Sequence, residues 1–231
     1  MIENIVCVIQ CRVGSTRLPH KSLLCLHGHP IAEWVFQRLS RSRKIHSLVF
    51  AIPDLEQDLP LYWTLRKLGA HVFRGSENDV LARFVNAAKE RAASHVIRVC
   101  GDNPLVDPQV IDSLVDFYFR SNCDYAYNHI PRENLHPDGL GAEICSFETL
   151  EKLNNKATLP NHREHLFNYL WDHKDDFKIL TFDPEQEYLR RPELRFDIDT
   201  WQDFMYLSQV PLNMDIGARE LISKFEGLRR F

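Results

Sequence analysis

The chain has 231 residues, of which 44% are hydrophobic and 26% are charged, an ordinary composition for a globular protein with one sizeable core. Its formal net charge of -4 at pH 7 argues against a general nucleic-acid-binding protein, because such proteins are usually basic. No apolar stretch approaches the ~18 residues that a membrane helix needs, so we expect no membrane partner. The six cysteines contain no CxxC pair, and Glu3 stands where a secretory leader would be basic. The sequence therefore predicts a reduced, cytoplasmic protein.

Up to about residue 120, apolar runs typical of buried strands alternate with amphipathic stretches typical of helices. The expected strands span 4–10, 46–52, 70–73 and 95–99. The expected helices begin after Pro30 and span 59–68, 79–93 and 108–120, with Asp79 as the N-cap of the third. This alternation with short connections predicts a doubly wound α/β sheet.

From residue 123 the apolar pattern is less regular. We expect strands near Tyr125 and Ile144, a helix over 162–173, a strand over 178–182, and a last strand over 194–198 that leads into a helix near Thr200. No internal repeat, low-complexity tract or linker divides the chain. We therefore predict one Rossmann-like α/β domain over residues 1–231, with 123–192 as an inserted or trailing subregion.

The loop after the first predicted strand is unusually basic. Arg12, Arg17 and Lys21 surround Gly14 in a chain whose net charge is negative. The single glycine matches neither a Walker A loop nor a dinucleotide fingerprint. Ligands of open α/β sheets bind beyond the carboxyl ends of the strands. We therefore predict that backbone N–H groups of residues 14–16 and the three cations hold a triphosphate; a solvated basic loop is the alternative.

Two further loops place carboxylates at predicted strand ends. Asp102 follows a buried strand and suits a hard divalent cation such as Mg²⁺, with an Asx turn or a helix cap as the alternative. Asp197 and Asp199 alternate onto one face of the last predicted strand, where they repel each other unless a cation lies near. Alternatively, Thr200 and Asp203 cap the next helix and Asp197 pairs with an arginine.

Motifs along nearly the whole chain, in the same order, resemble those of the sugar cytidylyltransferases. These include the ketodeoxyoctulosonate and N-acylneuraminate enzymes and, in particular, the spore-coat polysaccharide biosynthesis protein F group. The motifs are QxRxGSTRLPxK at 10–21, FRGSENDVLAR at 73–83, GDNPLVDP at 101–108, GLGAE at 139–143, REH at 163–165 and DIDT at 197–200. Two residues depart from the group's pattern: Cys11 stands where Ala is usual, and Gly141 where an acidic residue is common.

The resemblance implies a three-layer αβα mixed sheet of the nucleotide-diphospho-sugar transferase type. It also implies Mg²⁺-dependent transfer of CMP from CTP to a sugar acid, with release of pyrophosphate, for surface polysaccharide or glycoconjugate synthesis. The subregion 123–192 would then bind the acceptor or form a homodimer.

The resemblance also assigns residues. The nucleotide is expected to contact Gln10, Arg12, Gly14, Ser15, Thr16, Arg17 and Lys21, with Ser76, Asp79 and Arg83 near the base. The metal is expected at Asp102, Asp197 and Asp199, and the catalytic set is Lys21, Arg12, Asp102 and Asp199. The acceptor is expected to contact Asp138, Glu143, Arg163 and His165.

Several of these residues have structural alternatives. Instead of contacting the base, Asp79 would be a helix N-cap and Arg83 would form an ion pair on a helix surface. The acceptor-side residues would form local pairs on the surface. A zinc site at His162 and His165 lacks a third ligand at a suitable spacing.

Two other functions stay open. One is an enzyme of similar fold that acts on a sugar 1-phosphate or uses a nucleotide sugar as a glycosyl donor. The other is a nucleotide-binding protein without turnover. Pyrophosphate release with CTP alone would distinguish cytidylyl transfer from both.

Overall fold

Seven strands form the central sheet of the computed structural model, which describes residues 3–228. In the order β5-β4-β1-β6-β8-β7-β9, their bounds are β5 His71–Gly75, β4 Ser47–Pro53, β1 Ile5–Gln10, β6 His95–Cys100, β8 Glu143–Ser146, β7 Tyr125–Tyr127 and β9 Ile179–Leu180. The first four are mutually parallel, whereas β8 runs antiparallel to both β6 and β7. A separate hairpin pairs β2 (Cys25–Leu26) with β3 (His29–Pro30). The sheet is therefore mixed.

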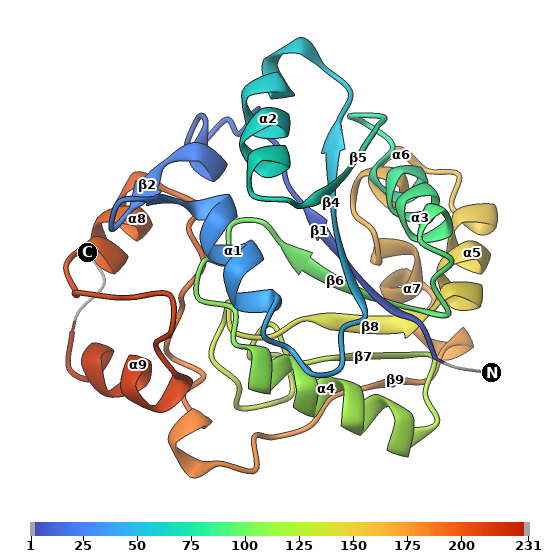
Figure 1. Ribbon diagram of the computed structural model, residues 1–231. Helices are drawn as coiled ribbons and strands as arrows, with labels where there is room; N and C mark the ends of the chain where they lie inside the picture. Colours follow the sequence, from blue (N-terminus) through green and yellow to red (C-terminus); the bar gives the residue numbers. More distant parts are fainter. Residues whose placement is uncertain (1–2, 229–231) are drawn as a thin grey trace.

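Helices cover both faces of this sheet (Figure 1). The α-helices are α1 Ile31–Leu39, α2 Leu59–Lys67, α3 Val80–Glu90, α4 Pro108–Ser121, α5 Phe147–Lys156, α6 Pro160–Glu164, α7 Asn168–Asp172, α8 Trp201–Ser208 and α9 Ala218–Phe225. Short 3₁₀ turns are η1 Lys21–Leu23, η2 Glu56–Asp58, η3 Lys174–Asp176 and η4 Glu187–Leu189. Side chains of α1, α2 and α4 pack on one face, and those of α3, α5 and α7 on the other. The predicted three-layer αβα fold is confirmed.

The continuous apolar run of β1 follows from its position in the middle of the sheet. Cys7 and Ile9 join the apolar cluster on the α1 side, whereas Val6 and Val8 join the cluster on the α3 side. A strand covered by helices on both faces needs apolar residues at every position, which is the pattern that the sequence shows.

A third apolar cluster holds the C-terminal part of the described chain. Residues of α8 and α9 pack against the β2–β3 hairpin and the start of α1. Phe196 and Ile198 are fully buried in this cluster, so the residues between and after them point elsewhere. Packing of alternate residues thus fixes the course of segment 195–199, which carries two of the predicted metal ligands.

The predicted strand over 194–198 is wrong, although the segment is extended. Its one ladder contact is an isolated bridge between Asp138 and Arg195. The next backbone bonds reach two different segments: Phe196 N–H donates to the carbonyl of Asp138, and Ile198 N–H to that of Asp102, both at 2.9 Å. The segment therefore joins two loops and does not belong to the sheet.

Other predictions for the second half need smaller corrections. The helix over 162–173 is wrong as one element, because His165 adopts an extended conformation (φ −109°, ψ 103°) and separates α6 from α7. This break lets Leu166 and Phe167 both enter the core. The strand over 178–182 shortens to β9. Helices α5 and α9 were not predicted at all.

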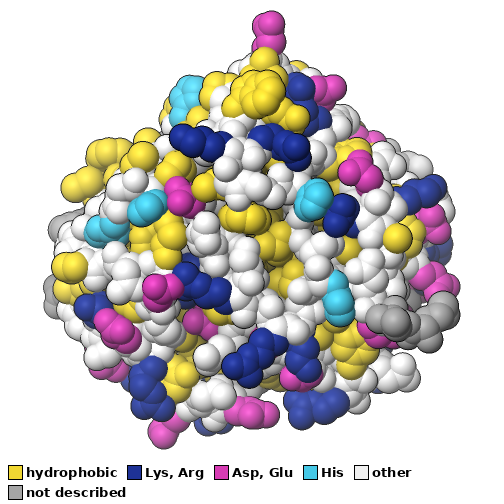
Figure 2. Space-filling model, in the orientation of Figure 1, with side chains coloured by type: hydrophobic (Ala, Val, Ile, Leu, Met, Phe, Trp, Pro, Cys, Tyr) yellow, Lys and Arg dark blue, Asp and Glu magenta, His cyan; other side chains and the backbone are white. Residues whose placement is uncertain are grey.

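The surface carries charges of both signs. Figure 2 shows the side of the molecule with α1 and α4, where cationic and anionic side chains are interspersed. Within residues 3–228, no helix combines the length and apolar character required to cross a bilayer.

Candidate active site

The candidate site is a pocket of about 220 Å³ at the carboxyl ends of β1 and β6, lined by residues 10–12, 15–17, 21, 22, 98, 100–102 and 199. The chain runs from β1 to β4 and β5 on one side of β1 and then crosses to β6 on the other side, so the strand order reverses at β1. Open α/β sheets bind their ligands at such a switch point. Two larger cavities of about 460 Å³ flank α4, but none of the predicted site residues lines them.

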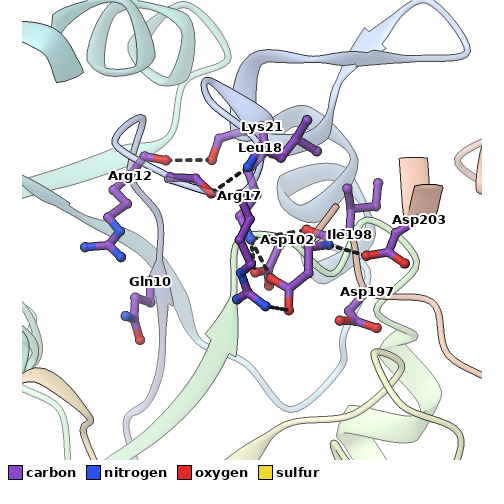
Figure 3. A network of polar contacts seen from close by, with 12 residues as sticks. Gln10, Arg12, Arg17, Leu18, Lys21, Asp102, Asp197, Ile198 and Asp203 are labelled. Carbon is purple, nitrogen blue, oxygen red and sulfur yellow. Dashed lines mark hydrogen bonds and ion pairs between the residues drawn. The ribbon is translucent and has the colours of Figure 1, made fainter. Parts of the chain in front are cut away.

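One lysine joins two carboxylates that are far apart in the sequence. The Nζ atom of Lys21 lies 2.5 Å from Oδ2 of Asp102 and 3.1 Å from Oδ1 of Asp199. Arg17 reaches the other oxygen of Asp199 at 3.1 Å. Figure 3 shows Arg17, Lys21 and Asp102 meeting at the centre of this network. Burial lowers the pKa of the Lys21 ammonium, but the two carboxylates outweigh burial and leave it raised.

Close backbone contacts bring the two carboxylates together. The N–H of Gly101 donates to the carbonyl of Gln10 at 2.7 Å, so the ends of β1 and β6 nearly touch. A Cβ at position 101 would lie 2.8 Å from both that carbonyl oxygen and Sγ of Cys11, so only glycine fits. The bond from Ile198 N–H to the Asp102 carbonyl then places Asp199 beside Asp102.

The two carboxylates form a donor set that suits a divalent cation. Both converge on a single cationic atom, the Lys21 ammonium, and both side chains are partly exposed. Mg²⁺ typically takes one or two protein carboxylates and leaves its other positions to water and phosphate oxygens. Across residues 3–228 no cluster of three His, Cys, Asp or Glu side chains is placed to share a metal ion.

Asp197 lies apart from this pair. Its carboxylate accepts two hydrogen bonds from Arg195, at 3.0 and 2.5 Å, as the alternative interpretation predicted. In Figure 3, Asp197 lies on one flank of the Lys21–Asp102 cluster, opposite Gln10 and Arg12. The structure thus brings Asp102 and Asp199 together and holds Asp197 next to them but outside the pocket lining.

The basic loop is held by a residue that the sequence analysis missed. Asp58, fully buried at the end of η2, accepts a hydrogen bond from the N–H of Val13 at 2.7 Å. Burial raises the pKa of this carboxyl. Arg12 is exposed, and its guanidinium has no hydrogen bond or ion pair to any residue within 3–228. Asp58 thus fixes the backbone next to Arg12, and the Arg12 side chain can bind an anionic ligand.

Of the remaining loop residues, Ser15 and Thr16 line the pocket and Gly14 does not. Gly14 lies beside Gln57, whose side-chain nitrogen would be 3.0 Å from a Cβ at that position. Oγ of Ser15 accepts a hydrogen bond from Leu18 N–H at 3.3 Å.

The three residues expected near the base stabilise their own loop. Asp79 is the N-cap of α3, accepting from the N–H of Ala82 at 2.9 Å, so the predicted cap is confirmed. Oγ of Ser76 accepts from the N–H of Asp79. Arg83 is not in a helix-surface ion pair: it is 1% exposed and donates to the carbonyls of Ser76 and Glu77. Arg83 therefore fixes the backbone of residues 76–77.

The four residues expected at the acceptor are dispersed. Oδ2 of Asp138 lies 3.4 Å from Nε of Arg195. Glu143 is buried on β8, next to β6 in the sheet, and His165 is exposed. Arg163 pairs with Asp79 at 2.6 Å, so the structure joins a predicted acceptor residue to a predicted base-side residue. None of the four lines the pocket at Lys21.

Gly141, one of the two departures from the family pattern, has a steric cause. A Cβ there would lie 2.3 Å from both the carbonyl oxygen and the side-chain oxygen of Asn128. An acidic residue could not occupy this position without moving Asn128, which bonds the N–H of Ala142.

The fold and this site define a nucleotidyltransferase-type protein, and comparison with known proteins gives the family. The chain belongs to the cytidylyltransferase family, whose sequence profile matches residues 6–222. It is 31% identical to the spore coat polysaccharide biosynthesis protein SpsF of Bacillus subtilis, over 96% of this chain and 94% of that protein. It is 30% identical to the 3-deoxy-manno-octulosonate cytidylyltransferase of Geobacter sulfurreducens, over 48% of this chain and 44% of that enzyme. A cytidylyltransferase structure from Leptospira borgpetersenii superposes with a TM-score of 0.88 at 29% identity, covering 97% of this chain and 94% of that one.

Proposed function

We propose that this protein transfers CMP from CTP to a hydroxyl group of a sugar acid and releases pyrophosphate. The observation that carries the proposal is the convergence of Asp102 and Asp199 on one cation beside the basic loop. Similarity to a 3-deoxy-manno-octulosonate cytidylyltransferase supports an acid acceptor, and similarity to SpsF supports a role in surface polysaccharide synthesis.

In this proposal the acceptor oxygen forms a bond to the α-phosphorus of CTP, its proton is released, and the bond from that phosphorus to the leaving pyrophosphate breaks. Arg12, Arg17 and Lys21 bind the β- and γ-phosphates and stabilise the charge on the leaving group. Asp102 and Asp199 would hold Mg²⁺, with Asp197 next to them. When bound, the ion would neutralise charge at the reacting phosphate.

The other assignments of the resemblance remain part of the proposal. Gln10 and residues 14–16 contact the nucleotide, and Ser76, Asp79 and Arg83 shape the base side through the backbone that they fix. The residues that the resemblance assigns to the acceptor, Asp138, Glu143, Arg163 and His165, stay predictions. A cytoplasmic location and a homodimer through residues 123–192 also stay predictions.

A pyrophosphate-release assay tests the proposal. CTP, UTP, GTP and ATP are each supplied with ketodeoxyoctulosonate, N-acetylneuraminate or a sugar 1-phosphate, with Mg²⁺ or with a chelator. Release with CTP and an acid, abolished by the chelator, is the expected result. Release with a sugar 1-phosphate alone would identify the alternative reaction, and nucleotide binding without release would identify a non-catalytic homologue. Either result contradicts the proposal.

A further inference from the structure

Arg98 is a pocket-lining cation that the sequence motifs do not single out. It lies on β6, two residues before the end of that strand, and its side chain is 20% exposed. It lines the same pocket as Lys21 and Asp102. The other cations of the pocket, Arg12, Arg17 and Lys21, come from the loop after β1 or the turn that follows it. Arg98 is therefore the cation that faces the pocket from the β6–β8 side.

Three side chains hold its guanidinium in place. Glu143 lies opposite Arg98 in the antiparallel β6–β8 pair, and its Oε2 accepts a hydrogen bond from Nη1. Oε1 of Gln10 accepts from Nε at 3.3 Å and from Nη2 at 3.1 Å. Tyr125 donates its hydroxyl hydrogen to Oε1 of Glu143 and so fixes that carboxylate. Because these groups belong to neighbouring strands, the guanidinium is oriented before any ligand arrives.

The Arg98–Glu143 pair is ionised. Burial raises the pKa of the Glu143 carboxyl, but Arg98, His129 and Tyr125 outweigh burial and leave it lowered. A guanidinium has five N–H donors, and the three bonds described above leave two, one on each terminal nitrogen. Each of these two remaining donors can bond one oxygen of a ligand carboxylate.

Arg163, the cation that the motifs place at the acceptor, is engaged elsewhere. Its Nη2 pairs with Asp79 at 2.6 Å, and its Nη1 donates to the carbonyl of Asn154 at 2.8 Å, so Arg163 links the ends of α3 and α5. On the nucleotide side, the basic loop follows β1 and the expected base segment follows β5. The side of β1 opposite to β4 and β5, where Arg98 lies, is then left for the acceptor.

We propose that Arg98 binds the carboxylate of the acceptor, next to the hydroxyl group that attacks the α-phosphorus. This assignment rests on the proposed function, because it requires an acid acceptor at this pocket. Glu143, Gln10 and Tyr125 are positioning residues that act through Arg98. Together they set the preference for an acid over a neutral sugar of the same size.

The test compares an acid acceptor with its carboxamide, which keeps the size and the hydroxyl groups but lacks the charge. The probe is whichever of ketodeoxyoctulosonate and N-acetylneuraminate the wild-type protein turns over with CTP. We expect the wild type to prefer the acid by about 30-fold in kcat/KM. Arg98→Lys and the double variant Arg98→Met/Glu143→Gln are expected to lose at least about 10-fold of this preference through KM for the acid, with the Kd for CTP nearly unchanged.

The double variant removes both charges of the pair, so it leaves no buried carboxylate without a partner. Its thermal unfolding and CTP binding report whether it folds. An unchanged acid preference in both Arg98 variants overturns the assignment, as does a loss of preference in Arg163→Lys alone. A wild type that turns over no acid acceptor contradicts the proposed function before any variant is compared, so the two failures are distinguishable.

Discussion

The two halves of the chain build their parts of the pocket in different ways. Residues 3–121 form four parallel strands with intervening helices, and the loops after these strands emerge at one edge of the sheet. Residues 123–228 contribute short strands of 2, 3 and 4 residues, and hold segment 195–199 by packing and by bonds to loops. The structure of the first half therefore follows from the local periodicity of its apolar residues, and that of the second half depends on contacts between distant segments. The pocket lies where the halves meet, with Asp102 from one and Asp199 from the other.

Replacing the carboxylate that each half contributes tests whether both halves are needed for the chemistry. Asp102→Asn and Asp199→Asn each replace a carboxylate at Lys21 with an uncharged amide of the same shape. We expect each to slow pyrophosphate release about 1000-fold, or ~4 kcal/mol of activation free energy. Thermal unfolding should change much less, because both side chains are partly exposed.

Asp197→Asn is the matched control for this pair. Its carboxylate bonds Arg195, so we expect a smaller loss of turnover and a larger loss of stability than at position 199. Equal losses of turnover at 197 and 199 would show that these two acids act together at the metal. Turnover near the wild-type rate in Asp102→Asn or Asp199→Asn would refute the convergence of the halves on one site.

A second prediction concerns the stability of the second half. His136 is 1% exposed, and burial, partly offset by Asp183 and the backbone of Phe182, lowers its pKa to about 4 from 6.5. Between these values the unfolded state binds more protons than the folded state, so stability falls as the pH is lowered, by about 3 kcal/mol at pH ~4. Urea unfolding of His136→Phe should depend less on pH in this window. Parallel pH profiles for the variant and the wild type would refute this role.

A third prediction concerns the basic loop of the first half. Lys21→Ala removes the cation expected at the β- and γ-phosphates, so CTP should bind about 30-fold more weakly, or ~2 kcal/mol. CMP lacks these phosphates and should bind almost as before, which calorimetry can measure. Lys44→Ala removes a lysine that pairs with Asp116 at the surface and serves as the control. Equal losses for CTP and CMP would place the lysine away from the pyrophosphate end.

A fourth prediction compares one threonine from each half. Thr200 caps α8 in a capping box with Asp203, so Thr200→Ala should cost ~1 kcal/mol of unfolding free energy. Thr64 lies inside α2, where alanine is the better helix former, so Thr64→Ala should be neutral or slightly stabilising. Denaturant midpoints measure both. Equal destabilisation at the two positions would show that the capping box adds nothing specific to the free energy of unfolding.

The sequence predicted most of what depends on local pattern. Strands β1, β4 and β6 were placed within a few residues, because each apolar run is followed by the helix that covers it. The caps Asp79 and Thr200 were confirmed for the same reason. Helix α5 could also have been found, since Ser146 is an N-cap and buried Leu150 and Leu153 follow at helical spacing.

What the sequence could not supply depends on contacts between distant segments. Asp58 holds Val13, and Arg98 meets Glu143, each across 45 positions of the chain. Polar and apolar residues alternate in segment 195–199, which predicts a strand, but its hydrogen-bond partners lie in loops. Periodicity does not show which segments a strand-like stretch will pair with. Periodicity also does not distinguish Asp197 from Asp199.

We expect Asp102 and Asp199 to share one divalent cation at the triphosphate end of a bound nucleotide. A crystal structure with CTP and Mn²⁺, which anomalous scattering locates without ambiguity, tests it most directly. We predict one ion bound by both carboxylates, with the Lys21 ammonium displaced from between them onto the phosphates. Bound CTP with Lys21 still bridging Asp102 and Asp199, and the ion elsewhere, would contradict this expectation.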